Sequence, residues 1–175
     1  PADAPKAIFI STFESAPLSI DNNFALDGMK DLFQKGLNYI IKLTEGKTHL
    51  NINADVSSLV FDSVEGVDIN KISGPHPAGN VGVQIHHIDP INKGDVIWYL
   101  KPQDVLVVAR LFTEGKYDVS RVVSLAGSQV LEPAYYNVIS GCCISDILDN
   151  NIKEGDNRII SGDILTGTKI NSDGN

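Results

Sequence analysis

Residues 6–13, with the sequence KAIFISTF, decide the fold of the first part of this chain. They form a short apolar run rich in β-branched and aromatic residues, and such a run predicts a buried strand. The next ten residues contain the helix and strand breakers Pro17, Asp21 and Asn23, so we expect a turn-rich loop there.

Helix and strand patterns alternate beyond this loop. Apolar residues recur on one helical stripe over residues 24–43, and Gly46 stands where the C′ residue of such a helix is expected. Residues 49–53 and 67–72 predict two further strands, and Asp55 between them is placed to cap a short helix. This β-α-β-α-β order is typical of a parallel sheet covered by helices.

A loop rich in Gly and Pro, residues 73–80, then leads into a stretch with two interpretations. The apolar residues of 81–88 share one helical face, with Asn80 in position to cap it, but alternation typical of a strand is also present. We favour the helix. Residues 96–100 (VIWYL) predict a strand, and residues 102–114 predict a helix with Pro at its first position and Gly directly after its end.

The pattern changes after Lys116. Short strands are expected over residues 121–125, 134–140 and 158–164, with one short helix over 144–149. A β-hairpin, a small helix and further strands suggest a β-grasp unit. We therefore expect two domains, residues 1–118 (a parallel α/β sheet) and residues 119–175 (a small β-grasp module).

The charge balance excludes several classes of partner. The chain has 14 basic and 22 acidic residues and a net charge of −8. Nucleic acids and anionic lipid surfaces require clustered Lys and Arg, so we expect neither as a partner.

No apolar run approaches the roughly 20 residues that a spanning helix needs, and the start of the chain does not resemble a signal peptide. Because both ends lack the features of natural termini, we expect an excised fragment.

Two segments could carry a ligand. Glu14 and Ser15 follow the first strand, where ligands of open α/β sheets bind, although a solvated turn is the simpler interpretation. Residues 74–82 (GPHPAGNVG) form a stiff loop in which Gly79 permits close backbone approach. If Asn80 starts a helix, free N–H groups of this loop would face an anion. A ligand loop and a structural crossover are equally good interpretations.

The remaining reactive side chains give weaker signals. His76, His86 and His87 do not have the spacing of a metal motif, so we expect no metal and favour a histidine that hydrogen-bonds a carbonyl or a ligand. Cys142 and Cys143 are neighbours with no second cysteine pair, which favours a small buried pair in a reducing compartment over the alternative, redox chemistry. No GxSxG motif supports a hydrolase, and we assign no catalytic residue.

Four strings resemble one known family. They are residues 7–17 (AIFISTFESAP), 74–90 (GPHPAGNVGVQIHHIDP), 111–116 (LFTEGK) and 158–167 (RIISGDILTG). Together they span the chain in the order found in the NqrA family, whose members are parts of the sodium-translocating NADH:quinone reductase. The family's members are two to three times longer, so the resemblance implies that this chain is a middle part.

The resemblance implies a fold and a role. The first region is similar to the Rossmann-like domain of the flavin- and NADH-binding subunit of complex I, and the second is similar to an SLBB domain. NqrA proteins are peripheral, lie on the cytoplasmic side of the bacterial inner membrane and carry no covalent flavin. We therefore expect the other subunits and ubiquinone as partners, no direct membrane span, and a ligand site formed by Glu14, Ser15, His76, Gly79, Asn80 and His86.

Two departures argue against flavin and NADH. In the flavin-binding relatives the strand corresponding to residues 6–13 is followed by two acids, but here Ala16 stands in place of the second. The Gly-rich flavin loop is also absent, so the phosphate-binding backbone is lost. We expect no bound cofactor, with ubiquinone as the ligand of the intact protein. A flavin or nucleotide module and a ligand-free scaffold are the alternatives.

Overall fold

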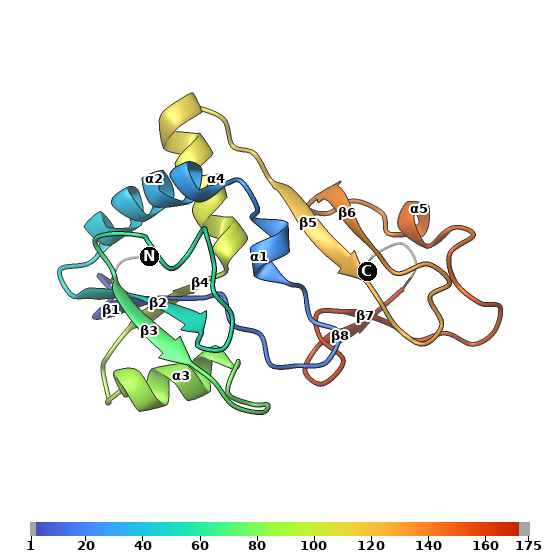
Figure 1. The fold of residues 1–175 in the computed structure, drawn as a ribbon, viewed down its shortest axis with the longest axis horizontal. Coiled ribbons are helices and arrows are strands. Elements are labelled where there is room, and N and C mark those ends of the chain that lie inside the picture. The colour runs from blue at the N-terminus through green and yellow to red at the C-terminus, as the bar shows by residue number, and fades with distance from the viewer. Residues whose placement is uncertain (1–2, 172–175) are drawn as a thin grey trace. The chain divides into compact units, whose positions relative to one another are not determined.

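Strand β1 (Ala7–Ser11) is buried along its whole length at the centre of a parallel sheet in the computed structural model, which describes residues 3–171. The sheet has four strands in the order β3-β2-β1-β4, where β2 is Lys47–Asn53, β3 is Asp68–Ile72 and β4 is Ile97–Leu100. All three pairings are parallel. The predicted parallel α/β sheet is therefore confirmed (Figure 1).

Helices cover both faces of this sheet. Helix α3 (Val81–Ile88) lies on one face, and α2 (Lys30–Ile40) and α4 (Pro102–Glu114) lie on the other (Figure 1). Phe9 of β1 packs with Ile85 of α3 in one apolar cluster. Ile8 and Ile10 point to the opposite face, because side chains alternate along a strand. Burial on both sides explains why residues 7–10 contain no polar side chain.

Helix α4 has the ends that its sequence predicts. Pro102 occupies its first turn, Asp104 accepts a hydrogen bond from the Lys101 backbone N–H at 2.8 Å, and Gly115 ends it with φ of 66°. Glycine adopts that left-handed backbone conformation with the least strain, because it has no Cβ. The helix packs closely on α2, because a Cβ on Gly36 would collide with the Val105 carbonyl.

The predicted helix over residues 24–43 is interrupted in the structure. Asp21 caps a short helix α1 (Asn22–Ala25), the chain turns at Gly28 with φ of 72°, and α2 is followed by the 3-10 turn η1 (Ile41–Leu43). The apolar stripe in the sequence continues across this break, because Leu26, at the end of α1, is buried as well. The periodicity of apolar residues therefore could not show where the helix is interrupted.

Two smaller predictions in this region are wrong. Asp55 does not cap a helix; its backbone N–H donates to the Asn53 side chain at 2.9 Å, and residues 54–63 form turns. Gly46 does not end a helix with a left-handed residue. It lies so close to the Lys6 carbonyl that any side chain would collide with it, so close approach is the reason for glycine there.

The chain divides into two compact units. Of the described residues, 3–15 and 21–118 form unit 1, while 16–20 and 119–171 form unit 2. Unit 2 contains two antiparallel pairs, β5 (Ser120–Leu125) with β6 (Ala134–Ile139) and β7 (Ile159–Ser161) with β8 (Thr168–Ile170), and the short helix α5 (Ser145–Leu148). Residues 1–2 and 172–175, on which the expectation of an excised fragment partly rests, lie outside the described residues.

The expected strand over residues 158–164 is shorter in the structure. It ends at Ser161, and Asp163 then accepts hydrogen bonds from the backbone N–H groups of Leu165 and Thr166. This side-chain-capped turn leads into β8, which the sequence did not suggest. These two bonds and a third from the Thr166 hydroxyl hold the pKa of the Asp163 carboxyl below its ordinary value, with the hydroxyl as the main cause.

Replacing Gly36 by alanine tests the close contact between α2 and α4. The new methyl group meets the Val105 carbonyl, so we expect Gly36→Ala to lower the free energy of unfolding by about 1–3 kcal/mol despite the better helix propensity of alanine. Gly82→Ala in α3 is the matched control, because its Cβ would meet nothing within 4 Å. Urea denaturation measures both. Equal or higher stability of Gly36→Ala would contradict the described packing.

Candidate functional site

The carboxyl end of β1 is the point at which the strand order of the sheet reverses. The chain runs outward from β1 to β2 and β3, then crosses to β4 on the other side of β1. The connections that flank this point pass over opposite faces of the sheet, through α2 and through α3 (Figure 1). Ligands of open α/β sheets bind beyond the strand ends at such a switch point.

Three predicted site residues meet at this end of the sheet. The Gly79 backbone N–H donates to the Ser15 hydroxyl at 2.8 Å, and the same hydroxyl lies 3.2 Å from Nδ1 of His76. Gly79 is buried, and a side chain on it would collide with the Ser15 backbone. Glycine is therefore required for the loop to reach Ser15. The His76–Pro77 peptide bond within the loop is cis.

These contacts allow a tautomer of His76 in which Nε2 carries the ring proton. In that tautomer the Ser15 hydroxyl accepts from the Gly79 N–H and donates its own proton to Nδ1. A histidine in this form presents Nε2–H as a donor to a neighbouring acceptor such as a carbonyl oxygen. The half-buried position of His76 leaves part of the ring accessible.

Glu14 and Asn80 flank this contact. Glu14 is exposed, and its charge acts on Tyr99 of β4. Asn80 stands at the N-cap position of α3, where its carbonyl accepts from the N–H groups of Val83 and Gln84, but its side chain makes no capping hydrogen bond. Both residues belong to the two segments that the Gly79–Ser15 hydrogen bond joins.

His86 is not brought into this group. It lies on the exposed side of α3, near the end of that helix, and its ring contacts the edge of His87 with centroids 5.3 Å apart. Three of the loop N–H groups that were expected to be free also have hydrogen-bond acceptors within the protein. Ala78 donates to Pro75, Gly79 to Ser15 and Asn80 to Pro77. These three N–H groups therefore have acceptors within the protein and are not available to an anion.

A row of three amide side chains, of which Asn51 and Gln84 are buried, holds the loop in place. Asn70 of β3 donates to Asn51 of β2 at 2.9 Å, Asn51 donates to Gln84 of α3 at 2.8 Å, and Gln84 donates to the Ala78 carbonyl at 3.1 Å. Each amide along the row is linked to the next, so the row joins two strands, a helix and the loop. Breaking it leaves a buried polar atom without a partner, which costs about 1–3 kcal/mol.

His49 lies beside this row on the same face of the sheet. Its ring stacks on Phe9 at 4.5 Å, and its Nδ1 is 3.3 Å from the Asn70 amide nitrogen. Its Nε2 is buried without a hydrogen-bond partner among the described residues. Burial lowers the pKa of His49 below its usual value, although the charges of Asp68 and Asp89 act in the opposite direction. This histidine is therefore neutral near pH 7.

Tyr99 is a site residue that the sequence did not indicate. It lies opposite Phe9 on β4, so it faces the same side of the sheet as the amide row. Partial burial raises the pKa of its phenol to about 12, with smaller contributions from Glu14 and Asp104. A phenol with that pKa stays protonated and donates a hydrogen bond over the whole physiological range. Its only sequence signal was its place near the carboxyl end of a strand.

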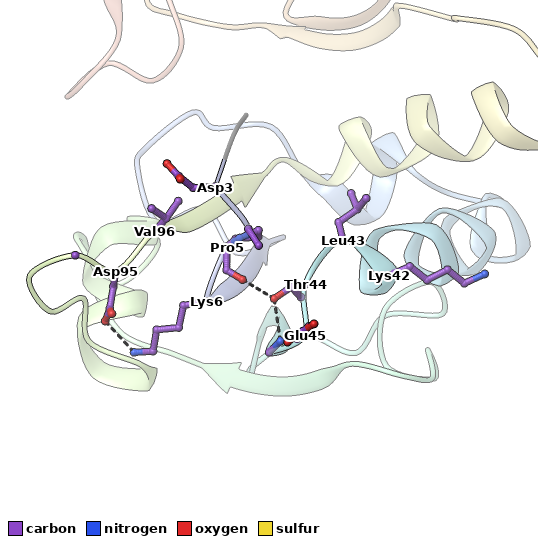
Figure 2. A pocket seen from close by; sticks show the side chains of 12 residues that line it. Asp3, Pro5, Lys6, Lys42, Leu43, Thr44, Glu45, Asp95 and Val96 are labelled. Atoms are coloured by element: carbon purple, nitrogen blue, oxygen red, sulfur yellow. Dashed lines mark hydrogen bonds and ion pairs between the residues drawn. The ribbon is translucent and has the colours of Figure 1, made fainter.

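A separate hollow of about 790 Å³ lies at the opposite end of the sheet. It is lined by residues that precede β1, β2 and β4, among them Lys6, Gly46 and Val96 (Figure 2). Lys6 donates to Asp89 at 2.6 Å and to Asp95 at 3.2 Å, and these bonds raise the pKa of the ammonium, with Asp89 as the main cause. Figure 2 shows Lys6 directed toward Asp95, so its charge is already neutralised by the protein.

Other reactive groups give a mixed result. Within residues 3–171, no three His, Cys, Asp or Glu side chains gather so that they could hold a metal ion. Cys142 and Cys143 are both exposed, so the prediction of a buried pair was wrong. They follow β6 in a small unit that has little interior. In such a unit even a small side chain can stay at the surface. No helix of the same described stretch is both long and apolar enough to cross a membrane.

Two models of known protein families match the chain. The family model described as "NqrA second alpha/beta domain" matches residues 1–117, and the one described as "NQRA C-terminal domain", an SLBB domain, matches residues 122–172. The chain belongs to the NqrA family. The resemblance drawn from the four strings is thus confirmed, and so is the expected order of an α/β domain followed by an SLBB domain.

Curated relatives share one name, that of the A subunit of Na(+)-translocating NADH-quinone reductase. The protein of Pasteurella multocida (strain Pm70) is 40% identical over 165 residues, which cover 94% of this chain and 37% of the relative. That of Yersinia pestis bv. Antiqua (strain Angola) is 37% identical over 172 residues, covering 98% and 38%. The chain spans less than two fifths of the length of these relatives.

Ser15→Ala tests the contact that closes the site. The variant leaves the buried Gly79 N–H without an acceptor, so we expect stability to fall by about 1–3 kcal/mol. The Gly79 amide should also exchange with solvent faster than in the parent chain. Ser63→Ala, an exposed serine of the same unit, is the control. Unchanged exchange at Gly79 in Ser15→Ala would show that this bond does not hold the loop.

The buried His49 predicts a pH dependence of stability. Its folded pKa lies below the unfolded value of about 6.5, so the unfolded chain takes up a proton first as pH falls. The neutral ring of His49 makes its full contribution to the free energy of unfolding above about pH 6.5. This contribution is lost as pH falls toward the folded pKa. We expect His49→Gln to flatten the decline of the unfolding free energy as pH falls below about 6.5. An identical slope in both proteins would contradict burial of the neutral ring.

Proposed function

We propose that this chain is part of the NqrA component of a sodium-translocating NADH:quinone reductase, peripheral and on the cytoplasmic side of the bacterial inner membrane. Its role there is to support quinone binding and complex assembly while electrons pass from NADH to ubiquinone. The observation that carries the proposal is the membership of both regions in the NqrA family, with relatives that are named for this reductase.

Quinone chemistry matches the donors at the carboxyl end of β1. A quinone is a flat, mostly apolar ring with two carbonyl acceptors, so it needs an apolar surface and one or two hydrogen-bond donors. His76 offers Nε2–H in the tautomer described above, and Tyr99 offers a phenol that remains protonated. Glu14, Ser15, Gly79 and Asn80 form the wall of this proposed site, while His86 stays on the exposed side of α3.

The same residues are poor ligands for a flavin or a dinucleotide. A phosphate group needs free backbone N–H groups, and three N–H groups of the 74–80 loop already have acceptors within the protein. Glu14 adds a negative charge nearby, and Ala16 replaces a second acid of the flavin-binding relatives. We therefore propose that this domain keeps the scaffold of a nucleotide-binding protein without its ligand.

Assembly is supported by the surface of unit 2. Several large apolar side chains there are exposed, and the most exposed is Ile139 at 64%. Others are Leu131, Tyr135, Ile164 and Leu165. Within residues 119–171, Leu148 is the one apolar side chain that is buried. A module with so little buried apolar surface gains stability by docking, which favours contact with other parts of the complex.

A titration with a short-chain ubiquinone tests the quinone site. We expect the amide signals of the non-proline residues of 74–80 and of Tyr99 to shift on addition of the quinone. His76→Ala and Tyr99→Phe should each weaken binding roughly 2- to 10-fold, the effect of one neutral hydrogen bond. His87→Ala and Tyr117→Phe, both at exposed positions, are matched controls.

The outcomes of this titration separate the alternatives. Shifts caused by FMN or NADH instead of quinone would support a flavin or nucleotide module. Absence of shifts with any of the three compounds would leave the ligand-free scaffold as the function of this chain. Quinone shifts confined to residues outside the 74–80 loop would overturn the assignment of the site.

A further inference from the structure

The neighbouring cysteines of unit 2 form an accessible pair of thiols. Cys142 and Cys143 are both exposed and neither is in a disulfide, and they follow directly on Gly141, whose φ of 86° marks a tight turn. The last ladder pair of β6 joins Ser120 with Ile139, so both cysteines lie outside the β5–β6 ladder. Oxidants and other small reagents can therefore reach either sulfur without unfolding the protein.

The surroundings of the pair favour reaction between the two sulfurs over metal binding. No third His, Cys, Asp or Glu joins them within the described residues 3–171 to make a metal site. The Ser145 hydroxyl lies 3.0 Å from the sulfur of Cys143, which holds that side chain at the start of α5. The N–H of Cys142 donates to the Ile139 carbonyl at 2.9 Å, so the turn keeps the two residues at the end of β6.

We propose that Cys142 and Cys143 are a reversible oxidation site that closes to a disulfide when it meets a peroxide. In the first step one cysteine releases its proton, and its thiolate sulfur attacks hydrogen peroxide. The sulfur–oxygen bond forms as the peroxide bond breaks, and the displaced hydroxide takes up the released proton and leaves as water. In the second step the neighbouring thiol attacks the sulfenic acid, the sulfur–sulfur bond forms and a second water leaves. Two thiols are oxidised and one peroxide is reduced, so atoms and electrons balance.

The spacing of neighbouring residues makes this disulfide a transient one. Adjacent Cα atoms are held about 3.8 Å apart by a trans peptide bond. Unstrained disulfides join Cα atoms about 4.4–6.8 Å apart, so the ring between neighbours is strained and more easily reduced. A strained, exposed disulfide is of the labile and regulatory kind rather than the structural kind. Closure also restricts the turn that connects β6 with α5.

Mass spectrometry of the peroxide-treated chain tests the proposal. After treatment and alkylation, we expect the parent chain to lose both alkylation sites together and about 2 Da of mass, with recovery of both sites in dithiothreitol. Dimedone, which traps sulfenic acids, should label the single variants Cys142→Ser and Cys143→Ser about tenfold more than the parent chain, because neither variant has a resolving thiol.

Three results would overturn the proposal. They are one cysteine that remains alkylatable in the oxidised parent chain, dimedone labelling of the parent chain equal to that of the single variants, and disulfide-linked dimers as the main product. Because both cysteines are exposed, their replacement by serine leaves the fold intact, and circular dichroism of the two variants verifies this. The double variant Cys142→Ser/Cys143→Ser should gain no mass in peroxide at the 142–143 peptide.

Discussion

The hydrogen bond from Gly79 to Ser15 is the contact on which the candidate site depends. It ties the segment after β1 to the loop before α3, two parts of the chain that are 64 residues apart in sequence. The contact is possible because Gly79 has no side chain, and because the buried amides of Asn51 and Gln84 hold the loop from the other side. His76 receives its orientation from the same serine hydroxyl. The position of the His76 donor proposed for quinone therefore depends on one small residue and one hydroxyl.

Much of the fold of unit 1 was predictable from local pattern. The apolar run of β1 and the Pro and Gly that bound α4 are local signals, and the structure has the strand and the helix where these signals place them. The break near Gly28 was not predictable, because the apolar stripe continues through it. The role of Gly46 was also hidden, since its need for glycine comes from the Lys6 carbonyl at the start of another strand.

The site was predictable only in part. Ser15, His76 and Gly79 were each suggested by their place after a strand or in a stiff loop, but their contact depends on the parallel register of the sheet. Tyr99 gave no signal of its own, because an aromatic residue in a predicted strand is ordinary core material. His86 shares a motif with the others yet lies on the exposed side of α3, since helical geometry separates it from the loop. The cysteines were misjudged because unit 2 has little interior to bury them.

The central claim is that the carboxyl end of β1 in this NqrA chain binds quinone, and photoaffinity labelling of the intact complex tests it most directly. A ubiquinone analogue with a photoreactive group on its ring would be irradiated in the complex, and the labelled peptides would be sequenced. The account predicts label in residues 74–80 or at Tyr99, with loss of that label when excess ubiquinone competes. Label confined to other regions of NqrA, or to other subunits, would contradict it.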